Sequence, residues 1–258
     1  MSAPRPFVLH EANYRQLLDY KPNVAILPWG ATEAHNYHLP HGTDVVQASE
    51  FAMESARLAY ESGAKPIVLP AIPFGNNAQQ LDQVATIHCS TATAQSILRD
   101  VATSLTTQGI DRLIILNGHG GNEFKPMIRD LQFEFPILVV VLNFWTVSME
   151  AYYEIFDETE GDHANEMESS LLLHLRPDWV VMDQAGDGRR NPFSIQSIKE
   201  VGGWTPRPWS KVHPDTGSGD PAAATVEKGA AYFQRTCAGI TKLIVEMSAA
   251  KKGELPYC

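Results

Sequence analysis

Five side chains that can bind a metal or transfer protons lie within twelve positions of one segment. The segment LPWGATEAHNYHLPHGTDVV contains Glu33, His35, His38, His41 and Asp44. In an extended backbone, the spacing of two sends Glu33 and His35 to the same side, as two ligands of one metal require. Asp44 begins a predicted helix and can return its carboxylate to the same place, although an aspartate there can also simply cap the helix. The cluster as a whole favours a metal site over a polar loop.

A further imidazole, His119, lies in the turn NGHGGN, directly after a strand-like run at 113–116. The glycines of this turn let the backbone approach a ligand closely. A neutral imidazole nitrogen suits a borderline metal such as zinc, manganese or iron. Two other interpretations stay open, namely a surface histidine in a glycine-rich turn and an anion site at the N-terminus of the following helix.

The third chemically suggestive segment is GDHANEMESS, which contains Asp162, His163, Glu166 and Glu168. We expect a helix to begin at His163, so that His163 and Glu166, three positions apart, share a face while Glu168 points away. An imidazole and a carboxylate on one face suit a ligand pair, or an acid–base group beside a ligand. For Asp162 and Glu168, acidic residues favourably placed in a first helical turn are the alternative.

The elements that must position these side chains alternate between short apolar runs and longer amphipathic segments. The predicted strands are 24–27, 67–69, 113–116 and 137–142, and the predicted helices are 45–61, 91–107, 123–133, 163–175 and 222–247. This alternation predicts an α/β fold, a three-layer αβα sandwich with a central, mostly parallel sheet. Ligands bind at the carboxyl ends of the strands in such sheets, where the candidate residues are expected.

The segment 183–219 is rich in glycine and proline and shows no sustained periodicity. Long irregular segments inside compact domains are often functional loops, but a contact with a neighbouring subunit would have the same composition. Both interpretations stay open.

Composition narrows the class of protein. The 258 residues include 30 acidic and 20 basic ones, for a formal charge of −10, so we expect no nucleic-acid or membrane partner. The three cysteines are too few for a disulfide framework, and neither a signal peptide nor a membrane span is apparent, so we expect one cytoplasmic domain over residues 1–258. A GxSxG elbow and phosphate-binding glycine patterns are absent from the sequence, and Cys89 is expected to be buried and inert.

Together, LPWGATEAHNYHLPHGTD, NGHGGN and DHANEMESS resemble, in this order, the signature segments of the creatininase (creatinine amidohydrolase) family. The resemblance implies a single α/β domain and a site for two divalent metal ions, zinc and/or manganese, with iron as an alternative. It also implies a small-molecule substrate, hydrolysis of a cyclic amide or formamide-like C–N bond, and a homohexamer.

Residue by residue, the resemblance assigns metal ligands and a catalytic pair. The ligands matched directly are Glu33, His35, Asp44 and His119, with Asp44 in the bridging position. Creatininase has a further glutamate two residues after the NGH histidine, where this chain has Gly121. We expect Glu166 to replace that ligand, with Glu168 as the alternative. His163 matches the family's catalytic histidine and is expected to carry a proton to the leaving nitrogen, with Asp162 at the preceding acidic position.

The expected substrate pocket differs from that of creatininase. The stretch 158–162 contains no aromatic residue where creatininase has a tryptophan, and VATI at 84–87 stands where FPGT is usual. Trp145 or an aromatic residue of the irregular segment is the expected replacement. The leading hypothesis is an amidohydrolase acting on a small cyclic amide, creatinine being one candidate. The alternatives are a formylaminopyrimidine deformylase and a non-catalytic binding protein that has lost the second metal.

Overall fold

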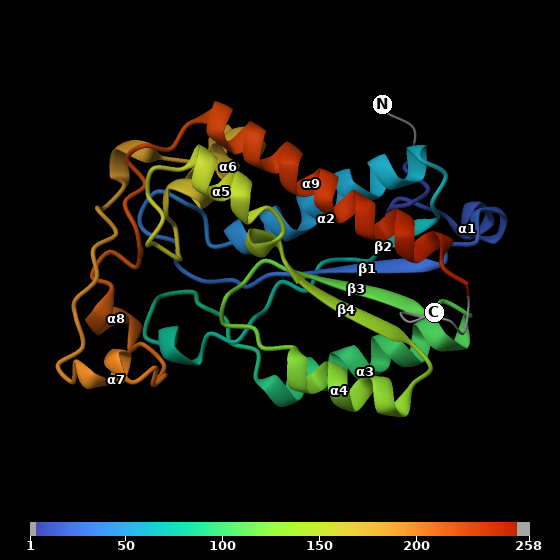
Figure 1. Cartoon of the computed structure of the whole chain (residues 1–258), viewed down its shortest axis with the longest axis horizontal. Coiled ribbons are helices and arrows are strands. Elements are labelled where there is room, and N and C mark those ends of the chain that lie inside the picture. The colour runs from blue at the N-terminus through green and yellow to red at the C-terminus, as the bar shows by residue number, and fades with distance from the viewer. Residues whose placement is uncertain (1–3, 252–258) are drawn as a thin grey trace.

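A four-stranded, fully parallel sheet forms the middle layer of the molecule (Figure 1), which a computed structural model describes over residues 4–251. The strand order is β2-β1-β3-β4, with β1 at Val24–Trp29, β2 at Pro66–Val68, β3 at Arg112–Asn117 and β4 at Leu138–Asn143. The two central strands are buried along their whole length, which explains their continuous apolar sequences. All four predicted strands are confirmed.

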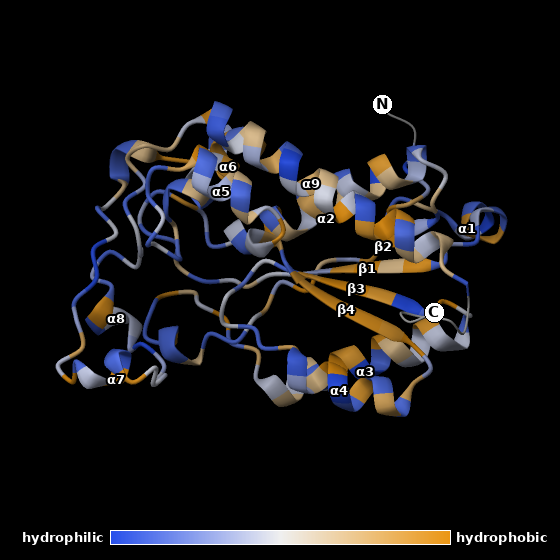
Figure 2. Ribbon diagram, in the orientation of Figure 1, coloured by the Kyte–Doolittle hydropathy of each residue, from blue (hydrophilic) through white to orange (hydrophobic). Residues whose placement is uncertain are grey.

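Helices cover both faces of this sheet. Helices α2 (Thr43–Glu61), α5 (Met149–Ile155), α6 (Glu166–Leu175) and α9 (Val226–Ala249) lie on one side, and α3 (Thr91–Thr107) and α4 (Lys125–Glu134) lie on the other (Figure 1). Successive side chains of a strand point to opposite faces of the sheet. Ile26 and Ile114 belong to the core under α2 and α9, whereas Leu27 and Ile115 belong to the core under α3 and α4. Figure 2 shows the strands as the most hydrophobic part of the chain. The predicted three-layer α/β fold is confirmed.

The helix predicted at 163–175 begins three residues later than expected, and this shift changes the candidate site. Helix α6 starts at Glu166, because Ala164 has a left-handed backbone (φ +48°) and the side chain of Asn165 caps the helix by accepting the N–H of Glu168. His163 therefore precedes the helix. The expected pairing of His163 with Glu166 on one helical face is wrong.

Several short elements have no clear signal in the sequence. They are α1 (Tyr14–Tyr20), α5, α7 (Ser197–Glu200), α8 (Trp209–Val212) and the 3-10 turns η1 (Ala78–Gln80), η2 (Phe144–Thr146), η3 (Pro177–Trp179) and η4 (Met182–Gln184). Helices α7 and α8 lie in the irregular segment, which extends beyond the carboxyl end of the sheet in Figure 1. Across residues 4–251, no helix combines the length and apolarity needed to cross a bilayer. Cys89 and Cys237 are free and buried, and Cys258 lies outside the described residues.

Candidate metal centre

The candidate ligands meet at the carboxyl ends of β1 and β3. These strands pair in register up to Trp29 and Asn117, so the turns that follow them leave the sheet side by side. Asn117 shapes the second turn, because its side chain accepts the N–H of His119 at 3.1 Å and donates to the His119 carbonyl at 2.9 Å. Asp44 joins them from the first turn of α2.

Two carboxylates and two imidazoles are packed together and are almost fully buried. His119 Nδ1 lies 2.8 Å from Glu33 Oε1 and 3.1 Å from Asp44 Oδ2, and His35 Nε2 lies 2.8 Å from Asp44 Oδ1. Burial alone would lower the pKa of His35, but the charge of Asp44 and its hydrogen bond outweigh burial and raise that pKa to about 10. Burial also acts to lower the pKa of His119, and Glu33 and Asp44 again raise it well above its usual range. The carboxylates thus create a strong preference for positive charge.

Three imidazoles in this region share one arrangement, in which a backbone carbonyl holds the ring nitrogen remote from the carboxylates. The pairs are His35 Nδ1 with Glu33 O (3.1 Å), His119 Nε2 with Asn76 O (3.2 Å) and His163 Nε2 with Ala34 O (2.8 Å). Because a carbonyl can only accept, each of these nitrogens carries the hydrogen. The other nitrogen of each ring can therefore present its lone pair, as metal-binding histidines require.

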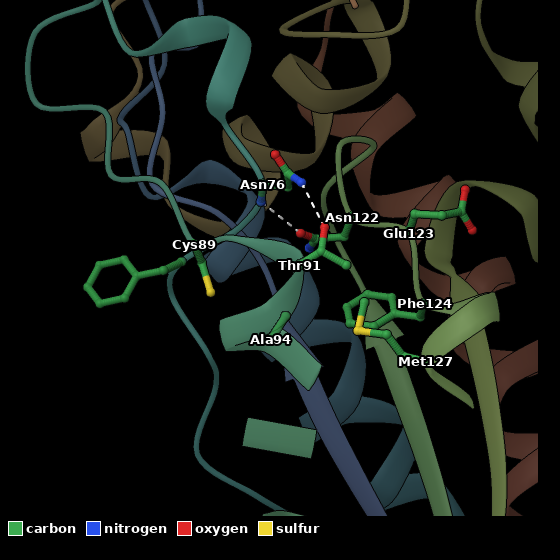
Figure 3. A pocket seen from close by; sticks show the side chains of 9 residues that line it. Asn76, Cys89, Thr91, Ala94, Asn122, Glu123, Phe124 and Met127 are labelled. Atoms are coloured by element: carbon green, nitrogen blue, oxygen red, sulfur yellow. Dashed lines mark hydrogen bonds between the residues drawn. The ribbon is translucent and has the colours of Figure 1, made fainter. Parts of the chain in front are cut away.

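The carbonyl that holds His119 lies beside a small pocket, shown in Figure 3. Asn122 fixes this region by accepting the backbone N–H of Asn76 at 3.0 Å, and the Asn76 side chain donates to Thr91 Oγ1 at 3.3 Å. Cys89 lines the same pocket, and burial raises the pKa of its thiol, as expected for an inert cysteine. Asn76 follows β2 in the chain, and no signal in the sequence pointed to its role.

The donor atoms fit a metal ion. Within residues 4–251, both carboxylate oxygens of Glu33 and Oδ2 of Asp44 are buried without a hydrogen-bond donor. With its hydrogen on Nε2, the His119 ring directs the lone pair of Nδ1 at the Glu33 carboxylate, 2.8 Å away. Two electron-rich atoms at this distance repel each other unless a proton or a cation lies between them. Imidazole nitrogens with carboxylate oxygens are suitable donors for zinc or manganese.

Among the described residues, three groups bring their donor atoms within 4.8 Å of one another. The groups are Glu33, Asp44 and His119; His35, Asp44 and Glu168; and Glu33, His35 and His163. Asp44 belongs to the first two groups, so its two oxygens can serve two neighbouring positions.

Glu168 reaches the site although the expected helical geometry directed it away. As the third residue of α6, it accepts the N–H of Ala164 at 2.5 Å, which turns its carboxylate back toward the start of the helix. Burial raises the pKa of Glu168 to about 7, even though His35 acts to lower it. The carboxylate is thus placed beside His35 and Asp44 at a considerable desolvation cost.

Glu166, expected at this position, has its carboxylate elsewhere. Oε2 accepts the backbone N–H groups of Asp157 at 2.9 Å and Glu158 at 2.7 Å, while Oε1 pairs with Lys228 at the start of α9. In the part of the chain that the structure describes, Glu166 belongs to none of the three groups. This placement corrects the expected one: because α6 begins at Glu166, its side chain faces α9 and the loop at 157–158.

His163 lies next to the candidate ligands without being on a helix. Its Nδ1 is 3.9 Å from Glu33 Oε1, and its ring centroid is 4.2 Å from that of His35. The backbone of His163 pairs with Ser218, as donor at 3.1 Å and as acceptor at 2.8 Å. Burial, followed by the charge of His35, lowers the pKa of His163, which favours the neutral ring.

Asp162 does not face the candidate ligands. Its two carboxylate oxygens each lie 3.0 Å from a guanidinium nitrogen of Arg207, and Oδ1 also accepts the hydroxyl of Ser218 at 2.6 Å. Neither partner had a signal in the sequence, because the segment that contains them has no periodicity. Asp162 therefore connects the site to the irregular segment.

The other candidates from the sequence occupy different surroundings. His38 pairs with Ser169 Oγ at 2.7 Å, and His41 pairs with the carbonyl of Val84 at 3.0 Å. Trp145 packs against the core under α9, whereas Trp209, from the irregular segment, contacts His163 with ring centroids 5.1 Å apart. Of these two tryptophans, Trp209 is the one at the site.

Gly121 has a steric reason to be glycine. A Cβ at this position would lie 2.4 Å from His119 Nε2 and 2.5 Å from the Asn76 carbonyl oxygen. A side chain here would break the hydrogen bond that orients His119. The missing carboxylate therefore follows from close packing around His119.

Comparison with known proteins identifies the family of this chain. The family model described as "Creatininase: Creatinine amidohydrolase" matches residues 10–244. A solved Bacteroides fragilis structure, of a protein proposed to be a creatinine amidohydrolase, is 40% identical, covers 97% of this chain and 99% of that chain, and has a TM-score of 0.89. The mycofactocin precursor peptide peptidase of Mycobacterium ulcerans is 27% identical over 84% of this chain and 82% of its own length. Creatinine amidohydrolase of Pseudomonas putida is 29% identical over 64% of this chain and 68% of its own length. The chain belongs to the creatininase family of amidohydrolases.

Proposed function

We propose that the protein is a metal-dependent amidohydrolase that cleaves the C–N bond of a small cyclic amide. The observation that carries this proposal is the buried set of donor atoms, in which unpaired carboxylate oxygens face imidazole nitrogens whose far sides are held by carbonyls. Such a set satisfies the requirements for a preorganised metal centre.

Two divalent ions, zinc or manganese, account for the donors best. One ion would be held by Glu33, Asp44 and His119, and the other by His35, Asp44 and Glu168, with Asp44 bridging. We therefore assign to Glu168 the ligand role expected of Glu166. Both carboxylates are buried, but only Glu168 shares a group with other potential ligands among the described residues.

The chain's own residues supply proton transfer and orientation. When bound, the ions act as Lewis acids that lower the pKa of a water molecule and polarise a carbonyl oxygen. His163 is neutral with its hydrogen on Nε2, so Nδ1 can take up a proton near Glu33 and deliver it to the leaving nitrogen. Ala34 fixes this tautomer through its carbonyl. Asp162 acts indirectly, since it faces Arg207 and Ser218.

A peptide bond is the second candidate substrate. The M. ulcerans relative is named a peptidase, and an open groove runs between residues 78–82 and 206–211 of this chain. Arg207 and Trp209 alternate in the chain with the groove-lining residues Pro206, Pro208 and Ser210, and they contact Asp162 and His163. A formylaminopyrimidine is a third substrate to include in the same screen.

Metal analysis and a substrate screen test the proposal together. Elemental analysis is expected to give about two equivalents of zinc or manganese per chain. The loaded protein is then screened against creatinine, other lactams, formylaminopyrimidines and short peptides. Metal binding without turnover on any amide would support a binding protein instead, and failure to bind metal after supplementation would refute the proposal.

His163→Ala separates metal binding from proton transfer. We expect this variant to keep its metal and lose about 10²- to 10⁴-fold in turnover, the usual contribution of a general acid–base group. His10→Ala, at an exposed histidine that belongs to none of the three groups of candidate ligands, is the matched control. Unchanged turnover in His163→Ala would remove this residue from the mechanism. The homohexamer also stays a prediction, which light scattering can check.

A further inference from the structure

Trp209 forms an aromatic wall beside His163. The two ring centroids are 5.1 Å apart, with the rings nearly perpendicular at 84°. Trp209 is only 3% exposed, and its indole N–H donates to the carbonyl of Thr216 at 3.0 Å. The indole also packs against the buried ring of His213, with ring centroids 4.2 Å apart. The indole is therefore held in place and restricts the orientations open to His163.

Arg207 links this wall to the residue preceding His163. Its guanidinium makes a two-pronged ion pair with Asp162, with both nitrogen–oxygen distances at 3.0 Å. The same guanidinium lies 4.6 Å from the ring centroid of Trp209, a cation–π distance. One side chain thus contacts both the aromatic wall and Asp162.

The backbone of the irregular segment completes the enclosure. Ser218 forms a reciprocal pair of backbone hydrogen bonds with His163 and a side-chain hydrogen bond with Asp162. His163 is consequently fixed through its main chain by Ser218, at Nε2 by Ala34, and across its ring by Trp209. Arg207 contacts Asp162 and Trp209 contacts His163, so both side chains act on the same two neighbouring residues. A role in packing alone would not require this convergence.

We propose that Arg207 and Trp209 are positioning residues that hold His163 with Nδ1 directed at the reacting atoms. The inference rests on the proposed function, because it assigns His163 the proton transfer. It gives the irregular segment a role in turnover: residues 207–218 complete the site from a part of the chain more than forty positions after His163. A misplacement of about 1 Å in such a group can cost about 10²-fold in rate.

The test compares variants of the metal-loaded, full-length protein. Trp209→Ala and Arg207→Met remove the two contacts, whereas Trp209→Phe and Arg207→Lys retain an aromatic ring and a positive charge. Trp204→Ala and Arg189→Met are matched controls, since both residues belong to the same segment and are exposed. The measurements are kcat and KM, metal content, and the rate at which diethyl pyrocarbonate modifies His163, followed by mass spectrometry.

We expect Trp209→Ala to lower kcat by about 10²-fold, with KM and metal content unchanged and modification of His163 faster. Arg207→Met is expected to lower kcat by about 10-fold, and both conservative variants should recover most of the loss. Wild-type kcat in both Trp209→Ala and Arg207→Met would overturn the inference, as would a loss of kcat that only follows a loss of metal.

The modification rate keeps this inference separate from the proposed function. If the wild-type protein hydrolyses none of the amides tested, the proposed function fails, but modification of His163 still reports its enclosure. Faster modification in Trp209→Ala than in Trp204→Ala would support the wall, whereas equal rates would refute it.

Discussion

Glu166 and Glu168 form a natural pair for testing the assignment of the metal ligands. Both are buried glutamates in the first turn of α6, two positions apart. Glu166→Gln should lower stability and leave metal content unchanged, because Glu166 pairs with Lys228 and two backbone N–H groups. Glu168→Gln should lower metal content, because its carboxylate lies beside His35 and Asp44.

The size of the stability effect follows from the contacts of Glu166. A hydrogen bond to a charged group contributes about 1 kcal/mol more than a neutral one, so the single oxygen of glutamine weakens the two backbone hydrogen bonds by about 1 kcal/mol each. The amide nitrogen cannot accept from Lys228, and the loss of that contact brings the total to about 3 kcal/mol. Lys228 keeps its contact with the exposed carboxylate of Asp157 at 2.7 Å, which prevents a larger loss. For a chain of this size, about 3 kcal/mol corresponds to a fall in Tm of about 6–12 °C.

The effect on metal binding follows from the group that contains Glu168. Glutamine keeps an oxygen for the Ala164 N–H but removes the negative charge facing the metal position. Mutation of a residue that only supports a ligand typically weakens metal affinity by about 10- to 100-fold. For Glu168, a proposed ligand itself, we expect the affinity for the ion held with His35 to fall by at least about 100-fold. At limiting metal, the content should fall from about two equivalents to about one.

The assay is calorimetry or thermal unfolding together with elemental analysis, on both variants purified and dialysed in parallel. Loss of metal in Glu166→Gln, with full metal in Glu168→Gln, would refute our reading of the start of α6. Equal metal content in both variants and wild type would refute the ligand role of Glu168.

Three further predictions concern the centre and its surroundings. Removing the metal with a chelator should lower Tm by about 5–10 °C, because an ion present at 100 times its Kd stabilises the fold by about 2.7 kcal/mol. Calorimetry before and after adding zinc or manganese measures this change, and an unchanged Tm would contradict the prediction. Gly121→Ala should weaken metal affinity by about 10- to 100-fold by disturbing the bond between His119 and the Asn76 carbonyl, as a competition titration would show. Burial lowers the pKa of His213 to about 4 in the folded protein, below its unfolded value near 6.5. The contribution of neutral His213 to the free energy of unfolding should therefore be complete above pH 6.5, and the free energy of unfolding should fall by about 2–3 kcal/mol as the pH drops toward 4. Denaturant unfolding of His213→Asn across this range should show a weaker pH dependence than wild type, and identical slopes would contradict the assignment.

Much of the fold and part of the site could be predicted from local pattern. The apolar runs at 24–27 and 113–116 are strands, and parallel strands end at a common edge, so the turns carrying Glu33, His35 and His119 had to lie close together. The helix predicted at 91–107 agrees with the structure because Ser90 caps it through a local hydrogen bond. Such features depend on nearby residues, which a sequence displays directly.

The choice between Glu166 and Glu168 depended on contacts distant in sequence. The backbone of His163 pairs with Ser218, and Ala164 adopts a left-handed conformation, so α6 begins at Glu166 rather than at His163. Because His163 precedes the helix, its position does not fix which side of α6 faces the site. Glu166 pairs with Lys228 of α9, and Glu168, two positions further on and therefore on a different side of the helix, faces the candidate ligands.

The sequence by itself determined the layered α/β architecture and the edge of the sheet where the candidate ligands gather, because hydrophobic periodicity and turn residues are local properties. Only the tertiary structure decided which glutamate of α6 faces the ligands, and that Arg207 and Trp209 contact Asp162 and His163. Those contacts join segments more than forty residues apart, and the segment that contributes Arg207 and Trp209 has no periodicity from which its folding could be inferred.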